Sequence, residues 1–108
     1  MKLIEYIRAD GSIPFSKWFN GLDAQAGAKG AVALVRLEQG NLSNVKWFKG
    51  IGEYRINWGP GYRIYLVQEG KKLIILFGGG TKQTQQKDIE NAIALLQEYK
   101  ERKDGSKQ

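Results

Sequence analysis

The sequence contains no cysteine and no histidine. Without cysteine, the chain can form no disulfide and can offer no thiolate to a metal ion. Without histidine, it lacks the commonest general base and the commonest metal ligand. We therefore expect no metal, and any catalysis has to use lysine, arginine, tyrosine, aspartate or glutamate side chains.

Long apolar stretches are also missing from the sequence. The longest is 73–77, which has the length of a buried strand and falls far short of the roughly 18 residues that cross a bilayer. The first residues, 1–5, become charged too soon for a signal peptide. With 108 residues, of which 42% are hydrophobic, we expect one globular domain over 1–108, located in the cytoplasm and not in a membrane.

Positive charge is what the sequence has in excess. Lysine and arginine number 17 against 11 acidic residues, which gives a net charge of +6. Such an excess favours a polyanionic partner, nucleic acid above all. The alternative is a basic protein whose charges are simply solvated.

Hydrophobic periodicity predicts an α+β domain. The expected elements are a strand over 2–7, helices over 13–20 and 24–38, strands over 45–48, 53–58, 62–68 and 72–77, and a last helix over 84–102. The two early helices form a hairpin packed, with the N-terminal strand, on an antiparallel sheet of about four to five strands. Turns are expected at 50–52, 59–61 and 69–71, and residues 103–108 are expected to be a flexible basic tail.

The hairpin over 53–65 is the most informative stretch, because strand side chains alternate between two faces. A three-residue loop at 59–61 would place Asn57 opposite Arg63 and Arg55 opposite Tyr65. Loops of two or four residues would instead bury one unpaired guanidinium, at a cost of several kcal/mol. We therefore expect one apolar face, covered by the three helices, and one open polar face that binds anions. The alternative is a solvated face on which Glu53 pairs with the arginines.

Two further segments carry basic residues. Gly78–Gly80 lead from a strand towards a helix start, where anions are favoured, and Lys82 follows them beside the arginine face. Neither a P-loop nor a G-x-G-x-x-G spacing is present, so we expect no nucleotide cofactor. Lys46 and Lys49 flank aromatic residues that can stack on bases. The alternatives are that the glycines only permit a tight turn, that Lys82 is an ordinary surface lysine, and that Trp47 belongs to the core or to an interface.

These segments together resemble a known family. The matching runs are Gly50-x-Gly52-Glu53-Tyr54-Arg55-Ile56, Gly59-Pro60-Gly61-Tyr62-Arg63-Ile64-Tyr65 and Gly79-Gly80-Thr81-Lys82-x-x-Gln85-x-x-Asp88-Ile89-x-x-Ala92, with Phe15-x-x-Trp18 and Arg36-Leu37-x-x-Gly40-Asn41 before them. They are similar to the HigB-like "addiction module killer" branch of the RelE/ParE toxin superfamily, from about Phe15 to Ala92. The resemblance implies a helical hairpin on a curved antiparallel sheet and a metal-independent ribonuclease that cuts mRNA in the ribosomal A site.

The resemblance also implies roles for residues and partners. The family's catalytic basic positions correspond to Arg55, Arg63 and Lys82, and we expect Tyr65 or Glu53 to accept the proton of the attacking 2′-hydroxyl. The expected RNA-binding residues are Lys46, Lys49, Asn57, Tyr62 and Gln85. The expected partners are the ribosome, mRNA and a HigA-like helix-turn-helix antitoxin, with operator DNA reached only through that antitoxin.

The sequence departs from the family at two points. Asn57 stands where some relatives carry a second lysine, and the C-terminal arginine and tyrosine of those relatives have no counterpart in the long last helix. Two other functions therefore stay open: a ParE-type gyrase poison, and a degenerate toxin that only binds its antitoxin or RNA.

Overall fold

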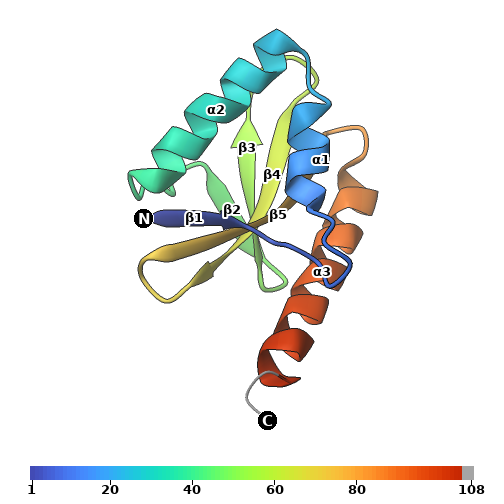
Figure 1. Ribbon diagram of the computed structural model, residues 1–108. Helices are drawn as coiled ribbons and strands as arrows, with labels where there is room; N and C mark the ends of the chain where they lie inside the picture. The colour runs from blue at the N-terminus through green and yellow to red at the C-terminus, as the bar shows by residue number, and fades with distance from the viewer. Residues whose placement is uncertain (106–108) are drawn as a thin grey trace.

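Five strands form one mixed sheet in the order β1-β5-β4-β3-β2, and three helices pack on it (Figure 1). The computed structural model describes residues 1–105. In chain order the elements are β1 (Lys2–Glu5), α1 (Pro14–Asn20), α2 (Ala24–Glu38), β2 (Val45–Phe48), β3 (Ile51–Ile56), β4 (Tyr62–Glu69), β5 (Leu73–Thr81) and α3 (Gln85–Gly105). The predicted α+β class, the five strands and the C-terminal helix are confirmed.

Helices α1 and α2 begin where the sequence allows a helix to start. Pro14 occupies the first turn of α1, where a missing N–H costs nothing. The carboxylate of Asp23 accepts a hydrogen bond of 2.9 Å from the backbone N–H of Ala26 and so caps α2. The helices bury Phe15 and Leu37 against one face of the sheet.

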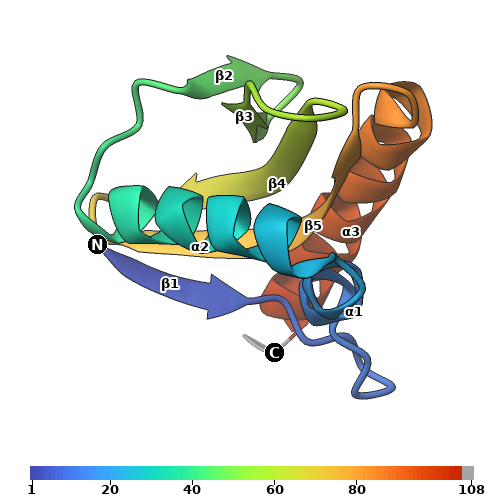
Figure 2. The same cartoon turned by 90° about the horizontal axis from the view of Figure 1, so that it is seen from above.

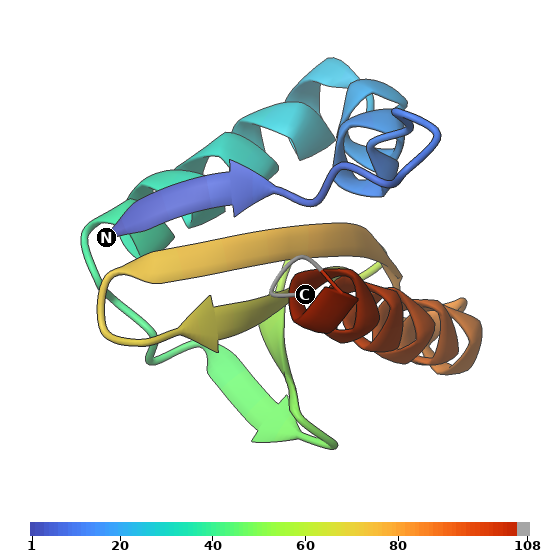
Figure 3. The same cartoon turned by 60° about the horizontal axis from the view of Figure 1, so that its bottom comes forward.

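The other face of the sheet is covered by α3, so the sheet lies between two helical layers (Figure 3). Ala92 and Leu96 of α3 pack there on apolar side chains that include Ile75 and Phe77. The prediction that this face is open is therefore wrong. Its polar residues occupy only one end, and the apolar remainder needs its own cover.

The predicted all-antiparallel sheet is also wrong at its edge. β1 runs parallel to β5, with Ile4 opposite Ile75. Parallel neighbours cannot be joined by a tight turn, and here residues 6–72, which include α1, α2 and three strands, separate β1 from β5. β1 is also shorter than predicted and ends at Glu5.

The β3–β4 hairpin has a longer loop than predicted. Arg55 lies opposite Arg63 and Ile56 opposite Tyr62, so residues 57–61 form a five-residue connection in place of the predicted three. The register is shifted by two residues from the prediction. Because the period of a strand is two, Arg55 and Arg63 still project from the same face, as predicted.

Three smaller differences concern the ends of elements, and the first is that β5 continues through the glycines that were expected to follow it and ends at Thr81 instead of at residue 77. The β2–β3 turn is formed by Lys49 and Gly50, both with positive φ (52° and 82°), and not by 50–52. Helix α3 continues to Gly105, so residues 103–105 of the predicted tail are helical, and 106–108 lie outside the described residues.

Within residues 1–105, none of the helices has the length and apolar character that a membrane span requires.

Candidate anion-binding site

Two rows of side chains cross the sheet on the face that α3 covers, near the first residue of that helix. In one row Arg55 of β3 lies opposite Arg63 of β4. In the neighbouring row Glu53 lies opposite Tyr65. The alternation of the strands therefore brings four of the five predicted catalytic residues together, on rigid elements rather than on loops.

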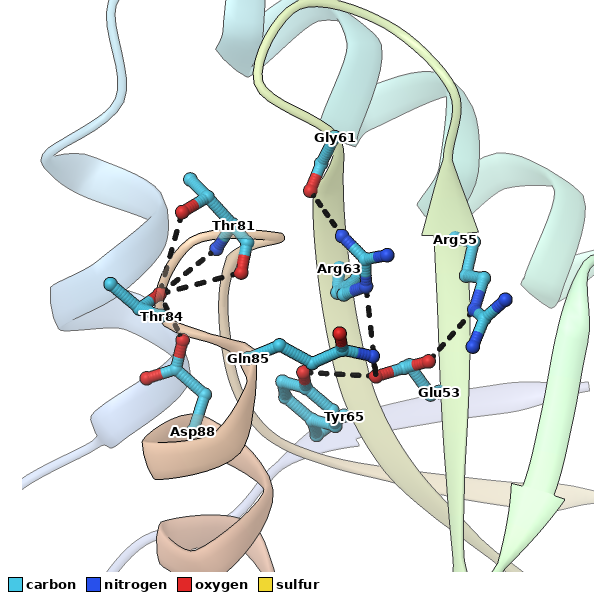
Figure 4. A network of polar contacts seen from close by, with 9 residues as sticks. All are labelled: Glu53, Arg55, Gly61, Arg63, Tyr65, Thr81, Thr84, Gln85 and Asp88. Carbon is cyan, nitrogen blue, oxygen red and sulfur yellow. Dashed lines mark hydrogen bonds and ion pairs between the residues drawn. The ribbon is translucent and has the colours of Figure 1, made fainter.

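Glu53 is the centre of this cluster and is fully buried (Figure 4). One carboxylate oxygen accepts a 2.8 Å hydrogen bond from Nε of Arg55. The other accepts hydrogen bonds from the Tyr65 hydroxyl (3.1 Å) and from Nε2 of Gln85 (2.9 Å), the first residue of α3. Nε of Arg63 lies 3.7 Å from that second oxygen, which is ion-pair distance but beyond a hydrogen bond.

This environment sets the protonation of both groups that were predicted to accept a proton. Burial by itself would raise the pKa of Glu53, but hydrogen bonds from Gln85, Arg55 and Tyr65 outweigh it and lower that pKa below its ordinary value. Burial, together with the negative charge of Glu53, raises the pKa of Tyr65 well above its ordinary value. Glu53 is therefore held as an ionised counter-ion of the arginines, and Tyr65 is held as a neutral hydrogen-bond donor. Both states are unfavourable to the predicted role of either residue as the general base.

The two arginines differ in exposure. The side chain of Arg55 is 40% exposed, whereas that of Arg63 is 10% exposed. Nη1 of Arg63 donates a 2.8 Å hydrogen bond to the carbonyl of Gly61, and its buried Nε has no hydrogen-bond partner among the described residues. The carboxylate of Glu53 lies between the two guanidinium groups, which come from neighbouring strands (Figure 4). Within ion-pair distance the two guanidinium groups share the single carboxylate of Glu53, while the negative charge of Asp88 acts on Tyr65 from the start of α3.

Lys82 comes close to this pair from the end of β5. A Cβ atom on Gly61 would lie 3.3 Å from Nη1 of Arg63 and 3.5 Å from Cβ of Lys82, so these two residues flank Gly61. The backbone N–H of Lys82 also faces the carbonyl of Pro60 at 3.4 Å. Lys82 itself is exposed. Lys82 therefore lies beside Arg63, as predicted, while no contact joins it to Arg55 among the interactions of the site.

The glycines of β5 let the start of α3 approach the sheet. A Cβ atom on Gly80, which pairs with Arg63, would lie only 1.7 Å from the Asp88 carboxylate. That carboxylate accepts a hydrogen bond from the hydroxyl of Thr84, the residue before α3. A larger residue at position 80 would displace the Asp88 carboxylate and disturb its hydrogen bond with Thr84.

The predicted RNA-binding residues are only partly gathered. Gln85 hydrogen-bonds Glu53, and exposed Lys46 lies opposite Glu53 on β2. Lys49 lies at the β2–β3 turn, on the order of 20 Å along β3 from Arg55. Tyr62 projects from the other face, where its ring lies 6.5 Å from that of Trp18.

Asn57 lies in the five-residue loop instead of opposite Arg63, and it lines a groove between α2 and β3. Sequence reasoning assigned no role in binding to Lys29 and Arg36, which line the same groove. Their spacing of seven residues, two turns apart on one helical face, is the signal that could have found them.

The arrangement is suited to holding an anion rather than a metal. Within residues 1–105, no group of three or more acidic side chains comes together in a way that could hold a metal ion. The cluster instead offers guanidinium groups on rigid strands, whose forked geometry matches the oxygens of a phosphate or a carboxylate.

No family model matches the chain. An uncharacterized protein of Haemophilus influenzae (strain ATCC 51907 / DSM 11121 / KW20 / Rd) is 40% identical over 94 residues, which cover 85% of this chain and 95% of that protein. At this identity and coverage the two chains share one fold and one ancestry. The chain therefore belongs to the same family as this Haemophilus influenzae protein.

Proposed function

We propose that the protein is the toxin of a bacterial type II toxin–antitoxin pair, a RelE/HigB-like endoribonuclease that cuts mRNA on the ribosome. Two lines of support converge on this function. The first is the resemblance carried by the runs around Arg55, Arg63 and Lys82. The second is the site itself, in which those three residues lie close together.

One observation carries the proposal: two arginines lie directly opposite each other on neighbouring strands. Like charges in that position destabilise a sheet. Here the single buried carboxylate of Glu53 lies within ion-pair distance of both. The ion pairs with Glu53 let the folded domain tolerate the two arginines, and a phosphate bound between them would supply further negative charge.

The reaction needs little from the protein beyond position and charge. The 2′-oxygen of a ribose attacks the adjacent phosphorus, the bond to the 5′-oxygen breaks, and the phosphorane-like transition state carries extra negative charge. Arg55 and Arg63 would bind the phosphate oxygens and stabilise that charge. Lys82, exposed at the rim, would protonate the departing 5′-oxygen.

Glu53 and Tyr65 have supporting roles in this proposal. The lowered pKa of Glu53 and the raised pKa of Tyr65 keep one as a carboxylate and the other as a phenol at neutral pH. Together they hold the arginines in place. The proton of the 2′-hydroxyl therefore leaves by another route, and a site completed by the ribosome would provide it.

The proposal also names partners. The toxin would act on ribosomes that are translating mRNA, and a neighbouring helix-turn-helix antitoxin would silence it and carry the pair to operator DNA. The positive net charge of +6 is favourable to association with the RNA of the ribosome.

The test is induction of the protein in bacterial cells, with growth and primer extension of transcripts as readouts. We expect growth arrest and cuts within translated messages. Arg63→Ala and Lys82→Ala should abolish both, whereas Arg8→Ala, which removes an exposed arginine far from the site, should not. Growth arrest that survives both site substitutions would overturn the assignment. An SOS response with intact messages would indicate a gyrase poison instead.

A further inference from the structure

A basic groove runs between α2 and the end of β3, next to the arginine pair. Its volume is about 290 Å³. The residues that line it are Lys29, Val32, Ala33, Arg36, Asn44, Tyr54, Arg55, Ile56, Asn57 and Trp58. Three of these side chains are cationic, and among the described residues none that lines the groove is acidic.

The groove exists because β2 is shorter than β3. β2 pairs with β3 only as far as Tyr54, and the backbone N–H of Arg55 still binds the carbonyl of Asn44 at 3.1 Å, so the edge of β3 has no strand beside it only from Ile56 onward. Figure 2 shows α2 running between β1 on one side and β3 on the other. Lys29, Val32 and Arg36 recur at helical spacing and therefore form one stripe of α2 that faces this edge.

Trp58 gives the groove an aromatic wall. Its ring stacks on Tyr62, with centroids 6.2 Å apart and planes at 21°. Nζ of Lys29 lies over the Trp58 ring, 5.6 Å from its centroid. Lys29 is exposed and its cation–π contact is weak, so a base could displace the ammonium from the ring while the charge moves to a phosphate.

We propose that this groove binds the backbone of single-stranded RNA on one side of the cleavage position, with Lys29 and Arg36 on phosphates and Trp58 stacked on a base. Arg55 belongs to both the groove and the arginine pair, so the strand would pass from one into the other. Trp58 is partly buried, and cations interleaved with an aromatic ring that a base can reach are typical of single-strand binding. The identity of the ligand as RNA rests on the proposed function, but the groove itself does not.

The aromatic wall favours RNA over an acidic protein segment. A peptide of aspartate and glutamate would use the three cations but would gain nothing from the face of Trp58. A nucleic acid uses both, because every base has a π face that stacks whatever its sequence. The groove should therefore show little sequence preference and a strong dependence on salt.

The experiment measures fluorescence anisotropy of a short labelled RNA whose riboses are 2′-O-methylated, so that it cannot be cut. Lys29→Ala/Arg36→Ala should weaken binding about tenfold or more and should reduce the slope of log K against log salt by about 1.4. Trp58→Leu should weaken binding at least about fivefold, with no change in slope. The matched control is Lys17→Ala/Lys71→Ala, which removes two exposed positive charges outside the groove.

Each outcome of these binding measurements either supports or overturns the proposal. Loss of binding in the groove variants but not in the control, with unchanged circular dichroism, supports the proposal. Equal weakening by both double variants would mean that only net charge matters, and would overturn it. The proposal would also be overturned if a polyglutamate peptide competed with RNA for the native protein and if the binding of that peptide were unchanged by Trp58→Leu.

The same measurements separate this inference from the proposed function. Arg63→Ala should leave most of the binding to the uncuttable RNA intact while it abolishes cutting of transcripts. If the groove variants cut transcripts as well as the native protein does, the role proposed for the groove would be overturned, but the proposed nuclease function would not. If RNA binding depends on the groove but the protein cuts no transcript, the proposed nuclease function would be overturned, but the role of the groove would not.

Discussion

Two carboxylate clusters in this molecule use the same chemical groups in different surroundings. Glu53 binds the Tyr65 hydroxyl and Arg55, with Arg63 alongside. Glu98, on the exposed side of α3, accepts a 2.6 Å hydrogen bond from the Tyr6 hydroxyl.

The second cluster is partly solvated. Arg8 donates to both oxygens of Glu98, at 3.2 and 2.8 Å, so that one guanidinium matches one carboxylate. The side chains of Arg8 and Glu98 are 44% and 30% exposed. Arg102 lies beyond them and donates to the Tyr6 hydroxyl at 3.2 Å.

The difference between the clusters lies in burial. The Glu98 cluster can exchange its contacts for water, so it fastens α3 to the segment after β1 and does little else. The Glu53 cluster cannot do so, because Glu53 and Tyr65 are almost inaccessible to solvent.

The largest expected effect separates the two carboxylates by stability. Glu53→Ala should lower the free energy of unfolding by about 3–5 kcal/mol, because it leaves Arg63 buried without a counter-ion. Glu98→Ala should cost far less. Urea denaturation followed by circular dichroism measures both, and Glu53→Gln, which keeps the shape, serves if the alanine variant does not fold. Equal costs for the two positions would contradict the comparison.

The two tyrosines give the next largest difference. Tyr65→Phe removes a donor to a buried carboxylate and should cost about 1.5–3 kcal/mol, whereas Tyr6→Phe should cost less than about 1.5 kcal/mol. Because the pKa of Tyr65 is raised, we also expect the folded Tyr65→Phe variant to retain growth arrest. Loss of arrest at an unchanged level of folded protein would show that the hydroxyl takes part in the reaction.

Acid should affect both clusters in the same direction. The pKa of Glu53 and that of Glu98 are lowered below the ordinary 4.5. Their contributions to stability are therefore complete above about pH 4.5 and are lost as the pH falls through the lower folded-state values. In Glu98→Gln the stability should still fall below pH 4.5, because the contribution of Glu53 remains. Asp10, whose pKa is lowered by hydrogen bonds from Ser12, adds to that fall. A flat profile would mean that Glu53 is not ionised in the folded protein.

The sequence was sufficient to place the arginines on one face but not to set their register. Strand alternation makes the face depend only on whether the loop has an odd number of residues, and both three and five are odd. The loop is longer because Trp58 leaves the strand, with its N–H bonded to the carbonyl of Ile56 and its ring stacked on Tyr62. Neither contact can be predicted from the hydrophobic periodicity of the sequence.

The cover provided by α3 could not be predicted for a related reason. The stripe that includes Ala92 and Leu96 indicates that α3 packs on the sheet, but it does not indicate on which face. That choice is made by the apolar side chains at the far end of the polar face, such as Phe77, and by the Gln85–Glu53 hydrogen bond. A polar row at one end of a face is therefore insufficient to predict that the whole face is open.

The smallest expected effect tests the idea that the outer cluster is only a fastening. Glu98→Gln should lower the free energy of unfolding by no more than about 1 kcal/mol, because a partly exposed ion pair is screened by water. The difference from the native protein should shrink further in 1 M salt, where exposed charges are screened over about 3 Å. Growth arrest should be unchanged, since the cluster lies at the other end of α3 from the arginine pair. If this substitution abolished arrest while leaving the fold intact, the outer cluster would also contact a partner, and burial would no longer distinguish the two carboxylates.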